Sequence, residues 1–115
     1  MITPQLSRQL IERVFRALGW VKDRDDHSAF WYSPDKCRIV TDAELDDCLR
    51  LPRHIVYVAA LCEAAEMLLD DARATERMNT EHDAILFRLA EEDRSQAARI
   101  LRRAGVTIAE WEKTR

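Results

Sequence analysis

The stretch from Arg53 to Met78, RHIVYVAALCEAAEMLLDDARATERM, contains neither glycine nor proline. Its apolar positions step by alternating four and three residues, the spacing that keeps side chains on one face of an α-helix. Within the stretch they are Ile55, Val58, Cys62, Ala65, Leu69 and Ala72, and Leu51 continues the same spacing just before it. Val56, Leu61 and Leu68 widen the stripe. A stripe of this width predicts a central helix that is contacted on more than one side.

A second long helix is predicted directly after the first. Thr80 suits its N-cap, with Asp83 in the first turn, and Gly105 suits its end. Because so few residues join the two helices, they must form an antiparallel pair. Inside the second helix, Glu91 to Gln96 reads EEDRSQ and leaves one turn without an apolar residue. This polar run predicts either a solvated gap or a polar patch that faces a partner.

The N-terminal segment predicts another amphipathic helix. Thr3 suits its N-cap, Pro4 suits its first position and Gly19 suits its end. One apolar face is formed by Leu6, Leu10, Ile11, Val14, Phe15 and Leu18.

The stretch from His27 to Val40, HSAFWYSPDKCRIV, predicts a β-hairpin or a three-stranded meander with a turn at Pro34. Strand side chains alternate between faces, so Phe30 and Tyr32 share one face and Trp31 lies on the other. Only one face can lie on the helices. Either the other face is covered by Trp20 or Trp111, or the aromatic that is left over belongs to a binding surface.

Two capping boxes predict short helices, one at Thr41–Glu44 and one at Thr107–Glu110. The predicted fold is therefore α+β and mainly helical. It comprises an N-terminal helix, a small β-hairpin, a short helix, a long antiparallel helical pair and a short C-terminal helix. Residues 1–115 are expected to form a single compact domain.

Composition limits the class of protein. The 115 residues are 47% hydrophobic and 34% charged, which is ordinary for a globular protein. The net charge of −3 is too small for a dense acidic mimic of DNA. Three cysteines without a Cys-x-x-Cys pair favour a reducing compartment. The first residues, MITPQLSRQL, lack the apolar core of a signal peptide, so we expect a cytoplasmic protein without a membrane partner.

One acidic stretch allows a test for enzymatic chemistry. Residues 61–71, LCEAAEMLLDD, resemble the Glu-x-x-Glu helix of all-α nucleotide pyrophosphohydrolases of the MazG type. That resemblance implies Mg²⁺ held by acidic residues of two helices, with Glu-x-x-Asp on the second. Here the second helix offers Glu91, Glu92 and Asp93, which lack that spacing. The histidines are scattered along the chain, so we predict no enzyme, no cofactor and no metal site.

The sequence instead predicts a non-enzymatic protein-interaction module. A small regulator or inhibitor of the kind found among phage and mobile-element accessory proteins would suit this size. Its partner would be another protein or a second copy in a homodimer. Two acidic surfaces contribute candidate contacts. One is the turn of the hairpin, which includes Asp23, and the other is the predicted short helix, which includes Asp42 and Glu44. The candidate contacts are Phe30, Trp31, Tyr32, Asp25, Asp26, Asp46, Asp47, Glu91, Glu92 and Asp93.

The alternative is a small DNA-binding regulator. Residues 97–115, AARILRRAGVTIAEWEKTR, look like a helix-turn-helix with a basic excess. The candidate nucleic-acid contacts are Arg99, Arg102, Arg103 and Lys113. Nucleic acid is the less favoured partner, because Glu110 and Glu112 would face phosphates in a helix of barely two turns.

Overall fold

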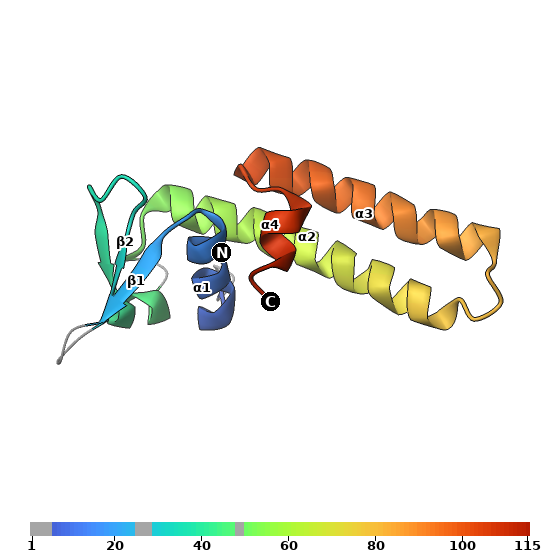
Figure 1. Ribbon diagram of the computed structural model, residues 1–115, viewed down its shortest axis with the longest axis horizontal. Coiled ribbons are helices and arrows are strands. Elements are labelled where there is room, and N and C mark those ends of the chain that lie inside the picture. Colours follow the sequence, from blue (N-terminus) through green and yellow to red (C-terminus); the bar gives the residue numbers. More distant parts are fainter. Residues whose placement is uncertain (1–5, 25–28, 48–49) are drawn as a thin grey trace, which may run out of the picture. The chain divides into compact units, whose positions relative to one another are not determined.

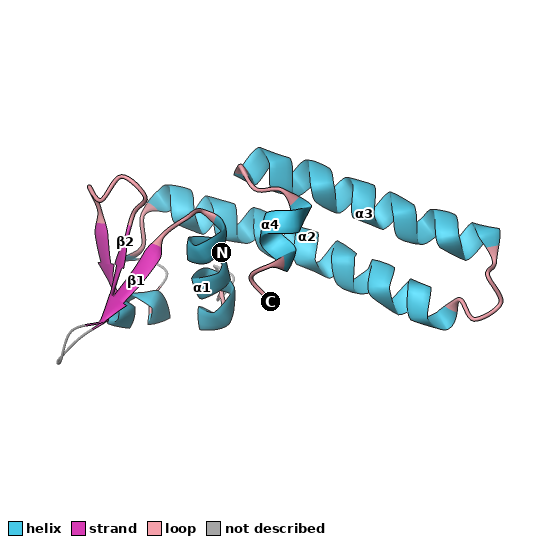
Figure 2. Cartoon of the chain, in the orientation of Figure 1, coloured by secondary structure: helices cyan, strands magenta, loops and turns pink. Residues whose placement is uncertain are grey.

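The computed structural model describes residues 6–24, 29–47 and 50–115. Its elements follow one another as shown in Figures 1 and 2. In order they are α1 (Arg8–Ala17), β1 (Val21–Arg24), β2 (Ala29–Tyr32), β3 (Ile39–Thr41), the 3₁₀ helix η1 (Asp42–Asp46), α2 (Arg53–Met78), α3 (Ala84–Ala104) and α4 (Ile108–Glu112). The predicted mainly helical α+β fold is confirmed.

The chain divides into two compact units. One contains residues 1–60 together with 109–115, and the other contains residues 61–108. The helix α2 begins in the first unit and ends in the second. The expectation of a single domain stays a prediction.

The sheet of the first unit has three antiparallel strands in the order β1-β2-β3. The strand β1 adds to the predicted hairpin, which makes it a meander. Across the sheet, Val21 pairs with Tyr32 and Tyr32 with Ile39. One position along, Lys22 pairs with Trp31, and Trp31 with Val40. Because neighbouring positions of a strand point to opposite faces, these two rows lie on opposite faces of the sheet.

Trp31 decides which face of the sheet is buried. It is 2% exposed, and its ring stacks on Phe15 of α1 with centroids 5.3 Å apart and planes 21° apart. Trp20 lies against the same Phe15 ring at 4.6 Å in a tilted arrangement. Trp31 is therefore a core residue, and its prediction as a partner contact is corrected. Phe30 and Tyr32, on the opposite face, are half-buried.

Replacing Trp31 should destabilise the protein. Trp31→Ala would empty the space beside Phe15 and Trp20, so we expect a loss of about 3–5 kcal/mol in the free energy of unfolding. Trp31→Phe keeps an aromatic ring on Phe15 and should cost clearly less. Urea unfolding followed by circular dichroism measures both values. A loss below about 1 kcal/mol for Trp31→Ala, the level of an ordinary surface change, would contradict a core role.

The first helix begins later in the chain than expected. Ser7 is the N-cap of α1, and its hydroxyl accepts a hydrogen bond of 3.2 Å from the backbone N–H of Leu10. The predicted cap Thr3 and the predicted first residue Pro4 lie outside the described residues. The predicted end is confirmed, because Gly19 has a φ of 85° directly after the helix.

Charged side chains join α1, β1 and η1. Arg8 of α1 forms an ion pair with Asp42 and a second one, of 3.2 Å, with Asp46. Lys22 of β1 lies 3.5 Å from the other carboxylate oxygen of Asp42. Burial opposes ionisation of Asp42. The hydrogen bond from Arg8 and the charges of Arg8 and Lys22 outweigh it, so the pKa of Asp42 is lowered.

This pKa shift makes stability depend on pH. A carboxyl group with a lowered pKa in the folded state contributes stability above its unfolded pKa of about 3.9. The contribution is lost as pH falls through the folded pKa. We therefore expect Asp42→Asn to be less stable than wild type at pH 7, on the order of 1 kcal/mol, with the difference vanishing in acid. Thermal unfolding between pH 7 and pH 2 measures this.

The matched control is Asp46→Asn, since Asp46 pairs with the same Arg8 from a more exposed position. It should show a smaller effect at pH 7. A constant difference between wild type and Asp42→Asn down to pH 2 would contradict the assignment.

The C-terminal segment is fastened to α1 within the first unit. Trp111 is fully buried, and the Arg13 guanidinium lies 4.1 Å from the centre of its ring. The Nε of Arg13 also donates a 2.9 Å hydrogen bond to the hydroxyl of Thr114. A buried Trp111 fits a capping segment better than it fits an exposed recognition helix.

The second unit is an antiparallel helical pair, as predicted. The seam between the end of α2 and α3 uses small side chains, with Ala65, Ala72, Ala90, Ala97 and Ala104 buried beside Leu69 and Leu101. Asp83, rather than the predicted Thr80, caps α3 and accepts a 2.8 Å hydrogen bond from the N–H of Ile85. The side chain of Asn79 holds the loop by bonding both backbone groups of Asp83. The predicted stop at Gly105 is confirmed by its left-handed φ of 83°.

The polar run of α3 is bridged to α2. Arg94 donates two hydrogen bonds, of 2.8 and 2.9 Å, to the carboxylate of Glu76. This bidentate contact lowers the pKa of Glu76. The turn without apolar residues is therefore joined to α2 through an ion pair.

Candidate functional site

The outer face of the sheet exposes apolar side chains. Val21, Tyr32 and Ile39 form one row across all three strands. Val21 is 63% exposed and Ile39 58% exposed. Phe30 follows in the next row, between Asp23 and Thr41. We call Val21, Phe30, Tyr32 and Ile39 the outer sheet face.

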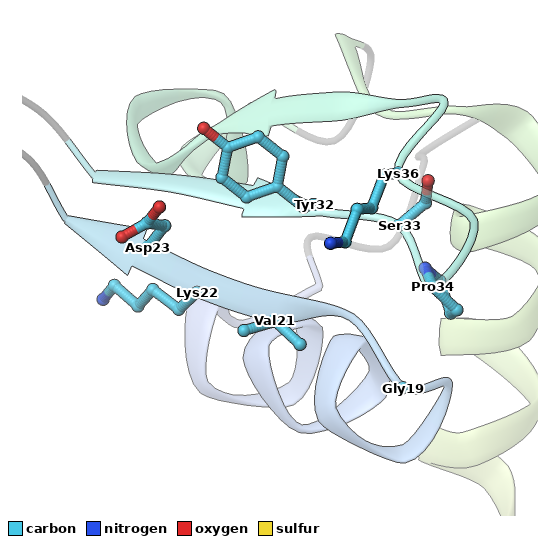
Figure 3. Close-up of a pocket in the computed structure, with 8 residues that line it drawn as sticks. All are labelled: Gly19, Val21, Lys22, Asp23, Tyr32, Ser33, Pro34 and Lys36. Carbon is cyan, nitrogen blue, oxygen red and sulfur yellow. The ribbon is translucent and has the colours of Figure 1, made fainter.

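A pocket opens at one end of this face (Figure 3). It is lined by Gly19, Val21, Lys22, Asp23, Tyr32, Ser33, Pro34 and Lys36, and its volume is about 560 Å³. Pockets that hold small ligands span roughly 300–1,000 Å³. This one is open to solvent instead of enclosed.

The turn that forms one wall of the pocket is fixed by hydrogen bonds. The N–H of Lys36 donates to the carbonyl of Ser33 at 2.8 Å, which closes the predicted turn around Pro34. The hydroxyl of Ser33 donates to the carboxylate of Asp35, which also accepts a 3.0 Å bond from the N–H of Cys37. These two hydrogen bonds, the one from Ser33 first, lower the pKa of Asp35.

Gly19 lies beside this turn in the lining of the pocket (Figure 3). Its φ of 85° is in the left-handed region, and a Cβ atom added there would lie 3.3 Å from the ring of Pro34. Hydrogen bonds of the turn and its close approach to Gly19 therefore shape this side of the pocket.

The acidic residues predicted as partner contacts are found in several places. Asp25 and Asp26 lie outside the described residues. Asp46 is exposed but paired with Arg8, and Asp47 forms an ion pair of 3.3 Å with Arg50. Part of the predicted acidic surface therefore serves contacts within the first unit.

The remaining predicted residues belong to other elements. On α3, Glu91 and Glu92 are exposed and Asp93 is half-buried. The residues predicted to contact DNA in the alternative hypothesis are all exposed: Arg99, Arg102, Arg103 and Lys113. The predicted second helix of that motif, α4, has only five residues.

Two acidic residues of the stretch 61–71, which resembles the pyrophosphohydrolase helix, pair with an arginine of the same helix. Arg73 lies 2.7 Å from Asp70 and 3.5 Å from Glu66. Within residues 6–24, 29–47 and 50–115, no three His, Cys, Asp or Glu side chains are grouped as a metal ion would need. In the same residues, no helix has the length and apolar character needed to cross a membrane.

Sequence reasoning missed two exposed apolar sites. Val21 and Ile39 were not recognised, because each becomes part of the site only through its pairing with Tyr32. Ile85 and Leu89 near the start of α3 were also missed, although the apolar segment AILFRLA at residues 84–90 is visible in the sequence.

No protein-family model, curated protein or solved structure matches the chain.

Proposed function

We propose that the chain is a non-enzymatic interaction module that binds another protein through the outer sheet face. The proposal rests on the row of Val21, Tyr32 and Ile39, which crosses all three strands of the sheet. Val21 and Ile39 are exposed to solvent on either side of the half-buried Tyr32. Large apolar groups gathered on one surface typically mark an interaction site.

The support beneath this face favours binding. Trp31 stacks on Phe15 directly behind the exposed row, and the strands that carry the row are paired along their length. A rigid surface loses little conformational freedom when a partner docks, so more of the contact energy contributes to affinity.

The pocket suggests how a partner would be held. Val21 and Tyr32 offer apolar walls, and the charges of Lys36 and Asp23 lie on the rim (Figure 3). A partner segment with one apolar side chain for the pocket and polar groups for the rim would fit. A regulator or inhibitor that occupies another protein's surface, including one of phage or mobile-element type, could act in this way.

Charge placed on the outer sheet face should weaken binding strongly. Val21→Lys and Ile39→Lys add an ammonium group to solvent-exposed positions, so the folded state should tolerate them. We expect recovery of a specific protein from host lysate to fall at least about 10-fold, as for an interface hot spot. Tagged wild type and variants are used to recover proteins from lysate with and without nuclease, and quantitative mass spectrometry compares the samples.

Tyr57→Lys is the matched control, because Tyr57 is an exposed aromatic residue of α2 that lies off the sheet. It should leave recovery unchanged. Undiminished recovery with both sheet variants would rule out this face as the binding site. Recovery that is lost after nuclease treatment would instead favour the DNA-binding alternative and its basic arginines.

A further inference from the structure

The helix α3 carries an exposed stripe along its whole length. Its positions alternate four and three residues apart, the spacing of a face that packs against another helix. The residues are Ile85, Leu89, Glu92, Gln96, Arg99 and Arg103, and all are exposed. We call them the α3 stripe. Ala90, Ala97 and Ala104, each one position beyond a stripe residue, are buried in the seam.

The chemistry of the stripe changes from one end to the other. Ile85, 71% exposed, and Leu89, 47% exposed, lie at the end of α3 that is joined by a loop to α2 (Figure 1). Met78 and Phe87, also exposed, lie at the same end. The middle of the stripe is polar, and the far end carries two arginines. No ion pair among the described residues involves Arg99 or Arg103.

This distribution of charge argues against a second copy as the occupant. In an antiparallel pair of α3 helices, Ile85 would lie opposite Arg103, and Leu89 opposite Arg99. In a parallel pair, each arginine would face its own counterpart, and like charges so placed repel. The stripe is therefore poorly complementary to itself over the length of the helix.

We propose that the α3 stripe binds an amphipathic helix of a different protein. That helix presents apolar side chains to Ile85 and Leu89 and carboxylates to Arg99 and Arg103. The apolar contacts provide most of the affinity, and the charge pairs set the orientation and register. The surface lies in the second unit and shares no residue with the outer sheet face, so it goes beyond the function proposed above.

The test starts from a phage-displayed library of 20-residue helices panned against the full chain. Selected peptides are then synthesised with a fluorescent label, and their affinity is measured by fluorescence anisotropy. We expect selected sequences to carry apolar residues at helical spacing toward one end and Asp or Glu toward the other.

Variants locate the binding site. Leu89→Lys should weaken binding at least about 10-fold by removing an apolar anchor. The double variant Arg99→Glu with Arg103→Glu should weaken binding to a similar extent and reverse its dependence on salt. Arg102→Glu is the control for charge: it reverses one charge beside Arg103 but off the stripe, half the change made by the double variant, and should leave affinity within about twofold. Ile39→Lys, on the outer sheet face, should also leave affinity unchanged.

Four results would overturn the proposal. The first is a selection whose peptides lack the apolar and acidic ends, or whose binding to the chain does not depend on Leu89. The second is a dimer in sedimentation analysis that Leu89→Lys dissociates, which would identify a second copy as the occupant. The third is salt-dependent DNA binding that Arg102→Glu weakens as much as Arg103→Glu. The fourth is loss of peptide binding in Ile39→Lys, which would place the site on the sheet.

Discussion

The stacking of Trp31 on Phe15 is the contact on which the first unit depends. It joins the middle strand of the sheet to α1 and places Trp31, the central residue of the inner row, against the helix. Because strand side chains alternate, burying Trp31 turns Tyr32 and its neighbours Val21 and Ile39 outward. One aromatic contact thus gives the unit its core and also determines which side chains a partner can reach.

The sequence predicted the long elements well, because their signals are local. The bounds of α2, Arg53–Met78, agree with the prediction, since a long apolar stripe free of glycine and proline leaves little choice. The stop at Gly105 and the turn at Pro34 were also found, because each depends on the backbone preference of one residue. The start of α3 was misplaced: Asn79 bonds the backbone of Asp83 and makes Asp83 the cap in place of Thr80.

The candidate site was less predictable, because exposure is a property of the packed chain. Both faces of β2 carry aromatic residues, so alternation separates Trp31 from Phe30 and Tyr32 without saying which side is buried. That choice depends on packing against Phe15 and Trp20. Both lie outside β2, so the alternation of side chains within the strand does not reveal it. The α3 stripe escaped for a similar reason: the seam is filled by alanines, and larger residues such as Ile85 and Leu89 remain outside it.

Site-specific photo-cross-linking can show whether the outer sheet face contacts another protein. A photoreactive benzoyl-phenylalanine would replace Ile39 on this face in one variant and the exposed Tyr57 of α2 in another, each in cells that contain the partner. We expect a discrete cross-linked protein at position 39 and none at position 57 after irradiation. No cross-link at position 39, or the same product from both positions, would contradict it.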